Sequence, residues 1–541
     1  MAEDERFDFV VVGAGSAGCP VAARLSEDPA TRVLLLEAGP EDRNPWIHLP
    51  IGYYRTIFDP RTARTFATEP DEQVAGRSIP WPRGRVLGGS SSINGLAWVR
   101  GQAEDYDHWR QRGCTGWSFA DVLPVFKRLE AYADGDPEWR GRHGPMAVSG
   151  PRHRMELLEA FIRAANQAGI PTNPDYNGAR QEGVGWFQLS IRNGFRCSAA
   201  VAYLRPARRR ANLAIRTEAL ACRLLLEGRR VVGLVYRQEG VERTVRVARA
   251  VILSAGAIAS PQLLMLSGIG PAEHLRALGI PVVHHLPGVG QNLQDHYQAR
   301  IVYRCSRPIT LNEVSRSAWR KAAAGLEWAL FRTGPLTVGA GVVALFWRTR
   351  PELATPDIQF HVIPFSADRP GQPLHPFPGF TISVCQLRPE SRGRLELRSS
   401  DPADAPRILA NYLATETDRR TMVDGLELIR TVMAQPAIRP LVAGEHLPGP
   451  DCRTREDLLA YVRTYGTTIF HPAGTCAMGP ADDPLAVVDP ELPVHGLEGL
   501  RVADASIMPT VVSGNTNAAC IMIGERCADF LRAEGGRRSS A

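Results

Sequence analysis

Three glycines and one acidic residue near the start of the chain have the spacing of a dinucleotide-binding site. Gly13, Gly15 and Gly18 follow the apolar run 8–12, and Glu37 comes after a second apolar run. Such glycines let the chain turn sharply and let its backbone approach a pyrophosphate, while the acidic residue accepts hydrogen bonds from a ribose hydroxyl. The pattern predicts a bound dinucleotide and does not separate NAD from FAD.

These residues need a strand, a tight turn and a helix to position them. DFVVV at 8–12 is an apolar β run, residues 16–25 favour a helix, and residues 32–36 favour the strand that leads to Glu37. The N–H groups and the dipole of a helix start complement phosphate charge. A glycine-rich turn in an ordinary α/β protein is the alternative, and the strand, helix and acid context favours the dinucleotide site.

A second glycine-rich segment, GRVLGGSSSINGLAWVRG, occupies residues 84–101. It is too rich in small residues and glycine for a packed helix or a central strand. We therefore expect a loop that lies against a flat or charged group.

Several further segments match family motifs in their family order, so the chain resembles the glucose-methanol-choline oxidoreductases, flavoenzymes that oxidise alcohols. The resemblance covers essentially the whole chain and implies that the dinucleotide is FAD. Besides 84–101, the matching segments are GAIASPQLLMLSGIG at 256–270, PGVGQNLQDH at 287–296, SRGRLELRSSDPADAPRILANYL at 391–413, HPAGTCAMG at 471–479 and RVADASIMPTVVSGNTNAACIMIGERCADF at 501–530.

The pattern of polar and apolar residues and the resemblance together predict an α/β chain (α+β overall). We expect it to have a discontinuous Rossmann-like FAD-binding domain and an inserted antiparallel-sheet substrate domain. IQFHVIPF at 358–365 and FTISVCQL at 380–387 alternate polar and apolar residues, which is typical of antiparallel strands with one solvated or cavity-facing side. RAVILSAG leads into a helix predicted at 260–267. The expected FAD-binding domain comprises 1–155, 210–300 and 460–541, and the substrate-binding domain 156–209 and 301–459.

Composition agrees with a folded enzyme of two domains. The 541 residues are 44% hydrophobic and 22% charged, and the net charge is only +6. We expect no nucleic-acid partner, and the basic cluster 205–210 is interpreted as a solvated patch, with contact to anionic lipid or a cofactor phosphate as the alternative. The ten cysteines are dispersed without metal-ligand spacing, which predicts reduced, buried thiols and no metal site.

The N-terminal sequence MAEDERFDFVVVG lacks the basic and apolar regions of a secretory signal. No window reaches the ~18 consecutive apolar residues that a membrane span needs. We expect a cytoplasmic protein. Peripheral contact with an inner membrane that holds quinone is left open.

His471 is the candidate catalytic base, because removing a hydride from an alcohol carbon requires that the hydroxyl proton also leave. Pro472 stiffens the backbone after it, and small residues at 473–475 allow close approach to another surface. A histidine in such a loop could be purely structural, but the resemblance places His471 at the catalytic position of the family.

The resemblance also aligns Asn515 with a family position that holds asparagine or histidine. An amide can hydrogen-bond an alkoxide-like oxygen without competing for its proton. Asn515 is thus the second predicted catalytic residue, with an Asx-turn role as the alternative. The predicted cofactor contacts are Gly13, Gly15, Ser16, Ala17, Gly18, Glu37, Ala38, Arg85, Val86, Gly88, Asn94, Gly95, Leu96, Ala97, Ala221, Asp504, Ala505, Thr516 and Asn517.

Two departures within the resemblance are informative. Some relatives attach FAD through a histidine just before the asparagine of the glycine-rich loop, and here that place is Ile93, so we expect noncovalent FAD. Fatty-acid photodecarboxylases of this fold lack the histidine kept here as His471, which argues against light-driven decarboxylation.

The predicted function is FAD-dependent oxidation of a primary alcohol to an aldehyde, with electrons passed to quinone or another acceptor. Ile469 and Phe470 are expected to line a pocket for an apolar or aromatic alcohol. Choline would need an aromatic cage and a carboxylate, and the sequence does not place that carboxylate. The alternatives are an oxygen-dependent oxidase that forms hydrogen peroxide, a choline dehydrogenase proper, and a flavin-binding protein without turnover.

Overall fold

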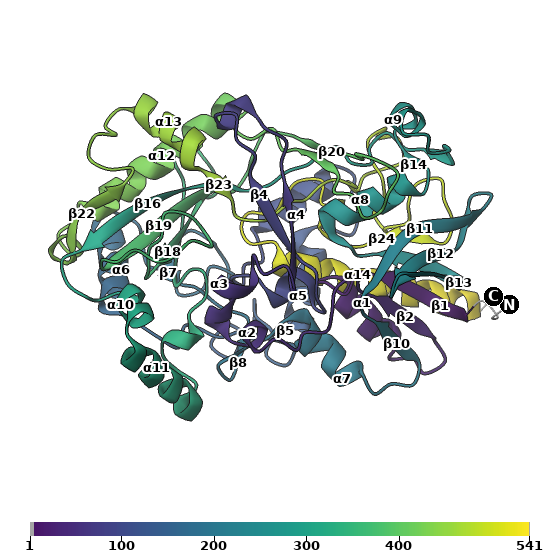
Figure 1. The fold of residues 1–541 in the computed structure, drawn as a ribbon, viewed down its shortest axis with the longest axis horizontal. Helices are drawn as coiled ribbons and strands as arrows, with labels where there is room; N and C mark the ends of the chain where they lie inside the picture. The colour runs from purple at the N-terminus through teal and green to yellow at the C-terminus, as the bar shows by residue number, and fades with distance from the viewer. Residues whose placement is uncertain (1–4, 540–541) are drawn as a thin grey trace.

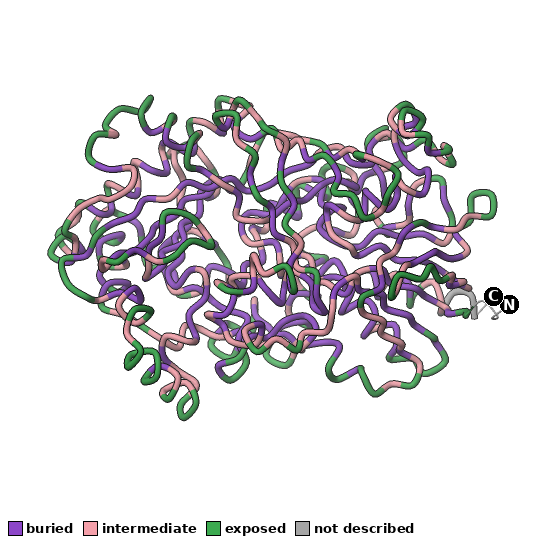
Figure 2. Tube along the Cα trace, viewed as in Figure 1, coloured by how far each residue is buried: buried purple, intermediate pink, exposed green. Residues whose placement is uncertain are grey.

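Two seven-stranded sheets lie at opposite ends of the molecule in the computed structural model, which describes residues 5–539 (Figure 1). The chain passes between them several times, so each sheet collects strands that are far apart in the sequence. Figure 2 shows that buried chain runs continuously from one sheet through the centre to the other. A site between the sheets can therefore draw on both.

The first sheet has the strand order β10-β2-β1-β13-β12-β11, with β24 beside β13. Its parallel part places β1 between β2 and β13, and β11 to β13 form an antiparallel meander at one edge. Parallel strands buried by helices on both faces read as continuous apolar runs, as in FVVV of β1 and VLLL of β2. The strands are β1 (Glu5–Val12), β2 (Val33–Leu36), β10 (Leu213–Arg216), β11 (Ala219–Glu227), β12 (Arg230–Gln238), β13 (Val241–Leu253) and β24 (Leu500–Val502).

Helix α1 (Gly18–Leu25) packs against β1 and β2, and the C-terminal helix α14 (Asn517–Ser539) packs against α1. A Cβ at Gly18 would lie 1.9 Å from the carbonyl oxygen of Gly13, so only glycine allows this helix to approach the turn so closely. The helix begins two residues later than predicted. Helix α8 (Gly256–Leu266) follows β13 directly and begins four residues earlier than predicted. Pro261 lies inside it and has no N–H for the Ala257 carbonyl oxygen, which accepts from Thr475 Oγ1 at 2.6 Å instead.

The second sheet is antiparallel, with the order β22-β16-β19-β18-β17-β7 and β23 beside β16. Helix α12 (Glu416–Met433) packs on β19 and β16. Every residue of β18 and β19 is buried, so their polar side faces the protein interior and not solvent. The strands are β7 (Gly183–Trp186), β16 (Tyr297–Cys305), β17 (Val343–Trp347), β18 (Ile358–Ile363), β19 (Gly379–Gln386), β22 (Val442–Leu447) and β23 (Thr467–Thr468).

This pair of sheets confirms the predicted fold class. The remaining helices cover the sheets or form the connections between them. They are α2 (Pro45–His48), α3 (Tyr53–Thr56), α4 (Ala103–Gln111), α5 (Phe119–Leu129), α6 (Glu156–Gln167), α7 (Arg205–Ala207), α9 (Ala272–Ala277), α10 (Leu311–Arg316), α11 (Ala318–Phe331) and α13 (Arg455–Tyr465).

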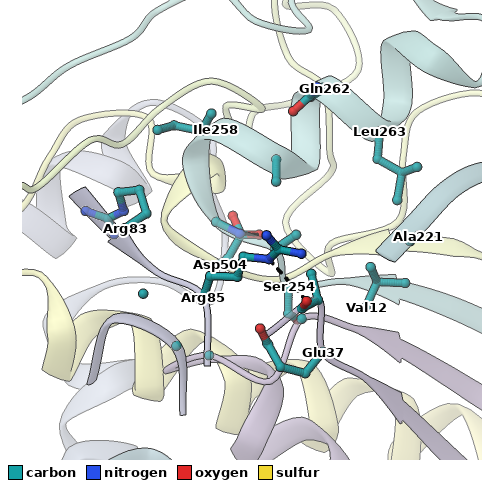
Figure 3. A pocket seen from close by; sticks show the side chains of 18 of the residues that line it. Val12, Glu37, Arg83, Arg85, Ala221, Ser254, Ile258, Gln262, Leu263 and Asp504 are labelled. Atoms are coloured by element: carbon teal, nitrogen blue, oxygen red, sulfur yellow. Dashed lines mark hydrogen bonds between the residues drawn. The ribbon is translucent and has the colours of Figure 1, made fainter. Parts of the chain in front are cut away.

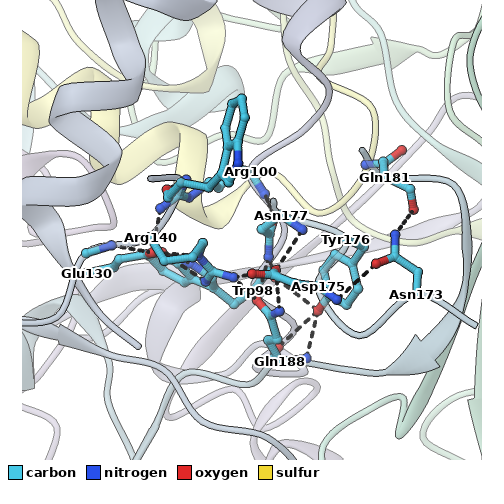
Figure 4. Close-up of polar contacts among 12 residues, drawn as sticks. Trp98, Arg100, Glu130, Arg140, Asn173, Asp175, Tyr176, Asn177, Gln181 and Gln188 are labelled. Atoms are coloured by element: carbon cyan, nitrogen blue, oxygen red, sulfur yellow. Dashed lines mark hydrogen bonds and ion pairs between the residues drawn. The ribbon is translucent and has the colours of Figure 1, made fainter. Parts of the chain in front are cut away.

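A buried ion network fixes the end of the glycine-rich segment (Figure 4). The Glu130 carboxylate accepts from Trp98 Nε1 at 2.9 Å and from Arg140 Nε at 2.7 Å, and it also pairs with Arg100. Arg140 Nη1 in turn lies 2.6 Å from Asp175 Oδ1. Burial alone would raise the pKa of Glu130, but the charges of Arg100 and Arg140 outweigh it and lower the pKa. The network joins three distant segments without an unpaired carboxylate at its centre.

Candidate active site

A cavity of about 430 Å³ lies at the carboxyl ends of β1, β2 and β13, where α/β sheets bind their ligands (Figure 3). Its walls include residues from the fingerprint turn, the start of α8 and the segment after β24. Among the predicted cofactor contacts, those that line it are Gly13, Gly15, Ser16, Ala17, Glu37, Ala38, Arg85, Ala221, Asp504 and Ala505.

The walls of this cavity fit a dinucleotide. A Cβ at Gly15 would point into the open space, with no atom closer than Ser254 O at 4.0 Å. Ala17 and Ala255, the residues that precede α1 and α8, both line the cavity, so the positive ends of two helix dipoles lie at its wall. The structure thus provides a glycine-walled space with two helix N-termini at its wall, which suits the pyrophosphate of FAD.

Glu37 lies at the wall of the cavity, and its carboxylate also holds the fingerprint turn in place. Its oxygens accept from the backbone N–H groups of Ala14 at 3.0 Å and Gly39 at 2.8 Å. Burial raises the pKa of Glu37 to about 7, although these two hydrogen bonds act in the opposite direction. Its predicted ribose contact stays a prediction.

Asp504 organises the opposite wall. Its Oδ2 accepts from Gly256 N at 2.8 Å and from Ser260 Oγ at 2.5 Å, and its Oδ1 accepts from Ser506 N at 2.8 Å. The carboxylate therefore ties the first turn of α8 to the segment after β24. Its predicted contact with the cofactor stays a prediction.

The other predicted cofactor contacts do not line this cavity. Asn517 Oδ1 accepts from Ser16 Oγ at 2.8 Å, which joins the start of α14 to the fingerprint turn. Leu96 belongs to a buried apolar cluster against which Ile469 packs. The residues outside the cavity lining are Gly18, Val86, Gly88, Asn94, Gly95, Leu96, Ala97, Thr516 and Asn517, and their roles toward FAD stay predictions.

The two predicted catalytic side chains lie together. Asn515 Nδ2 is 3.3 Å from His471 Nε2. On its other side, Asn515 Oδ1 accepts from Gln359 Nε2 of β18 at 3.1 Å. The structure brings together two residues that are 44 positions apart in the chain.

A third side chain, His296, completes a hydrogen-bonded chain with a defined direction. His296 Nε2 is 3.0 Å from the carbonyl oxygen of Leu387, and His296 Nδ1 is 3.0 Å from His471 Nδ1. Because the carbonyl can only accept, His296 carries its proton on Nε2 and accepts at Nδ1. His471 must then donate from Nδ1, which leaves the lone pair of Nε2 directed toward Asn515.

Burial favours the neutral form of both rings. It lowers the pKa of His296 to about 4. It also lowers the pKa of His471 well below its usual value, with the charges of His296, His361 and Arg83 acting in the same direction. The neutral His471 ring is therefore the base form, and it is available at neutral pH.

The backbone around His471 is fixed from both sides. His471 N donates to Asp295 Oδ1 at 2.8 Å, and Arg83 Nη1 donates to the Phe470 carbonyl oxygen at 2.7 Å. Phe470 has a φ of 69°, a left-handed conformation that non-glycine residues adopt mainly where the surrounding structure imposes it. Since Arg83 also lines the cofactor cavity, the histidine loop lies directly beside that cavity.

Four residues of this site were absent from the sequence prediction: His296, Asp295, Gln359 and His361. His296 and Asp295 end the segment PGVGQNLQDH, which was recognised as a family stretch without roles for its residues. Gln359 and His361 lie on β18, and their alternation was read only as a sign of an antiparallel strand.

Several other sequence-based expectations have clear structural outcomes. Arg205 and Arg208 of the basic cluster face the acidic residues Asp42 and Glu41, which supports the surface-patch interpretation. The ten cysteines are all free, and eight of them are buried. Asp368, His375 and His446 bring possible ligand atoms within 4.8 Å of one another, a grouping that sequence spacing does not reveal.

Within residues 5–539, no helix combines the length and the apolar character that crossing a bilayer requires.

Comparisons with known proteins identify the family. Models of the GMC oxidoreductase family match residues 7–298 and 389–524. The chain is 46% identical over 537 residues to a mitochondrial choline dehydrogenase of Homo sapiens, covering 98% of this chain and 90% of the relative. It is 43% identical over 528 residues to an oxygen-dependent choline dehydrogenase of Brucella ovis, covering 97% and 95%.

Solved structures show the same fold. Pyridoxine 4-oxidase from Mesorbium loti superposes with a TM-score of 0.88 at 32% identity, covering 97% of this chain and 99% of the other. The chain therefore belongs to the GMC oxidoreductases, FAD-dependent enzymes that oxidise the CH–OH group of alcohol substrates.

Proposed function

We propose that His471 is the base and Asn515 the stabilising group in oxidation of a primary alcohol to an aldehyde. The observation that carries this assignment is the direction of the hydrogen-bonded chain from Leu387 through His296 to His471. It places the His471 proton on Nδ1 and leaves Nε2 as an acceptor beside an amide donor.

In this mechanism the substrate hydroxyl donates its proton to His471 Nε2. The Asn515 amide, oriented by Gln359, donates to the substrate oxygen as negative charge develops on it. His296 accepts from His471 Nδ1–H throughout and stabilises the imidazolium that forms. Bound FAD supplies the hydride acceptor for the alcohol carbon.

We further propose that the first sheet and its loops hold FAD noncovalently, and that the second sheet holds the substrate. Ile93 is buried in a small apolar cluster with Ile47, Ala63 and Val86, so it presents hydrocarbon where some relatives present a histidine. Ile469 packs against the apolar cluster that contains Leu96, beside the histidine loop, which supports its assignment to the substrate pocket.

Anaerobic flavin reduction tests the catalytic assignment. The holoenzyme is mixed with a panel of primary alcohols while flavin absorbance is followed. His471→Ala should keep its FAD and slow reduction by roughly 10²- to 10⁴-fold, the usual contribution of a positioned base. His143→Ala, a change at an exposed histidine, should reduce normally. Wild-type rates in His471→Ala would assign the base elsewhere, and absence of reduction by any alcohol would support a binding protein without turnover.

The pH profile gives a second readout. Protonated His471 cannot accept the hydroxyl proton, so reduction should slow as pH falls and rise with pH through the apparent pKa of the site. Since burial lowers the pKa of His471, the rise should be complete below about pH 6.5, the ordinary histidine value. A rate that still climbs above neutral pH would contradict this assignment.

For the electron acceptor we propose membrane quinone, with oxygen as the alternative that peroxide formation in air would reveal. Helix α11 projects from the body of the molecule (Figure 1). Arg320 and Lys321 are exposed near its start, a charge pattern that suits anionic lipid. Its exposed large apolar side chains are Trp319 (80% exposed), Leu326 (61%), Leu330 (64%) and Phe331 (68%).

Binding to lipid vesicles tests this contact. The holoenzyme should co-sediment with vesicles that contain phosphatidylglycerol, with a change in Trp319 fluorescence, and bind less to pure phosphatidylcholine. A Leu326→Ser, Leu330→Ser double variant should lose this binding, whereas Val241→Ser, at an exposed valine of β13, should not. If the double variant binds vesicles normally, or only alters self-association, the membrane assignment is wrong.

A further inference from the structure

Arg300 extends the polar face of the second sheet away from the catalytic histidines. Side chains two residues apart on a strand share a face, so Arg300 of β16 lies on the same side as Gln298. His296 immediately precedes this strand, and both His296 and Arg300 act on His361. In the antiparallel register, Arg300 lies opposite Ser383 of β19, and Ser383 lies opposite His361 of β18. Arg300 and His361 therefore flank Ser383 on one face, about 10 Å apart across two strand spacings.

Among the described residues, the Arg300 guanidinium has no acidic partner. Its Nε is buried and makes no hydrogen bond, and no ion pair of the described chain includes it. The ionisable groups that act on it are the phenols of Tyr53, Tyr54 and Tyr461, and burial lowers its pKa. Arg140, by contrast, is held by Glu130 and Asp175. A guanidinium left without an anion in such a place is costly unless something supplies one.

His361 adds a second unsatisfied group on the same face. Its Nδ1 is buried without a hydrogen-bond partner, and its ring stacks on Phe187 at 5.2 Å between centroids. Burial lowers the pKa of His361 to about 4, the Asn515 side chain acts to raise it by a hydrogen bond, and the positive charge of Arg300 lowers it. His361 thus lies between Arg300 and Asn515, the residue proposed to bind the alcohol oxygen.

The carboxylate nearest to the histidines is already in use. Asp295 accepts from His471 N and from the Tyr412 hydroxyl. It is buried on the backbone side of the histidine loop and leaves no free carboxylate for a cationic headgroup. Of the described side chains placed on this face above, Arg300 is the one that carries a charge, and that charge is positive.

We propose that Arg300, assisted by His361, binds a carboxylate group of the substrate, so that the enzyme oxidises hydroxy acids with a terminal alcohol and not a quaternary ammonium alcohol. A guanidinium matches a planar carboxylate with two parallel hydrogen bonds. This inference rests on the proposed function, because it assumes that the alcohol end of the same molecule lies at His471 and Asn515.

The test compares ω-hydroxy acids of increasing length with their methyl esters and with choline, using anaerobic flavin reduction. In the wild type, one hydroxy acid should exceed its own ester in kcat/KM. Arg300→Gln should remove this preference, lowering kcat/KM for the acid by about 30-fold or more, as expected for loss of a buried charge pair. Its rate with the neutral ester should stay within about twofold, and Arg300→Lys should keep part of the preference. Arg304→Gln, at an exposed arginine of the same strand, is the matched control and should behave as wild type.

Binding of a carboxylate without a hydroxyl gives a readout that does not depend on turnover. The unsubstituted acid of the best length should perturb the flavin spectrum of the holoenzyme and bind at least tenfold more weakly to Arg300→Gln. Equal losses for acid and ester in Arg300→Gln, or wild-type preference for choline, would overturn the proposal. If esters reduce the flavin but acids neither react nor bind, the substrate inference fails while the proposed alcohol oxidation stands.

Discussion

Replacing His296 with leucine should slow flavin reduction even though His296 need not touch the substrate. The change removes the acceptor for His471 Nδ1–H, which His296 provides at 3.0 Å. His471 then loses the hydrogen bond that keeps its proton on Nδ1. The tautomer with the proton on Nε2 becomes accessible, and that tautomer cannot accept the substrate proton.

The magnitude follows from the burial of this contact. Both histidine rings are buried, so the orphaned Nδ1–H has no water to replace its partner. A buried donor left unsatisfied costs about 1 to 3 kcal/mol, which corresponds to a roughly 5- to 150-fold slower reduction step. The alcohol KM should change little, because the contact lies on the side of His471 away from Asn515.

Rapid-mixing flavin reduction with His296→Leu and His296→Gln separates positioning from packing. The glutamine amide can donate to the Leu387 carbonyl oxygen and accept from His471, so His296→Gln should recover much of the lost rate. Leucine fills the space without either hydrogen bond. A wild-type rate in His296→Leu, or equal rates in the two variants, would refute the reasoning about the tautomer.

Four further predictions concern the cofactor, the Asn515 amide and the buried ion network. Gly15→Val should abolish FAD loading, since its side chain would fill the space beside the fingerprint turn; normal flavin content on purification would show that the pyrophosphate lies elsewhere. Acid precipitation should release free yellow FAD into the supernatant, because Ile93 offers no ring nitrogen; flavin that stays in the pellet would disprove noncovalent attachment. Asn515→Ala should slow flavin reduction on the order of 10²-fold and leave the pH profile in place, with Asn515→His milder, whereas normal reduction would leave the asparagine as a turn former. Glu130→Ala should cost about 3 to 5 kcal/mol of unfolding free energy in urea, since it strands two buried arginines, and a loss below 1 kcal/mol would contradict the network's role.

The dinucleotide half of the site was predictable because its residues are close in sequence. Gly13, Gly15 and Gly18 lie on one turn, and Glu37 follows at the end of the adjacent strand, so local spacing determines their geometry. The cavity lining confirms that several of these residues share one surface. His471 and Asn515 were found through the resemblance, and the structure shows them in contact.

The partners of those two residues could not be predicted, because they come from strands whose facing is decided by register. Alternation in β18 shows that Gln359 and His361 share a side, but not which side faces His471. His296 forms a hydrogen bond with the carbonyl oxygen of a residue 91 positions away. Arg300 Nε is buried without a hydrogen-bond partner. Neither a hydrogen bond between distant residues nor the absence of one can be predicted from local sequence.

The hydrogen bond between Ser16 and Asn517 has a consequence for biosynthesis. It joins residues 501 positions apart, and β24 reaches its partner β13 only near the end of the chain. During translation the N-terminal strands can collapse early, but the wall formed by Asp504 and Ala505 does not exist until these two residues have left the ribosome. The cavity therefore lacks this wall until these residues have emerged, and before that point the apolar fingerprint strands have to stay protected without a complete cofactor site.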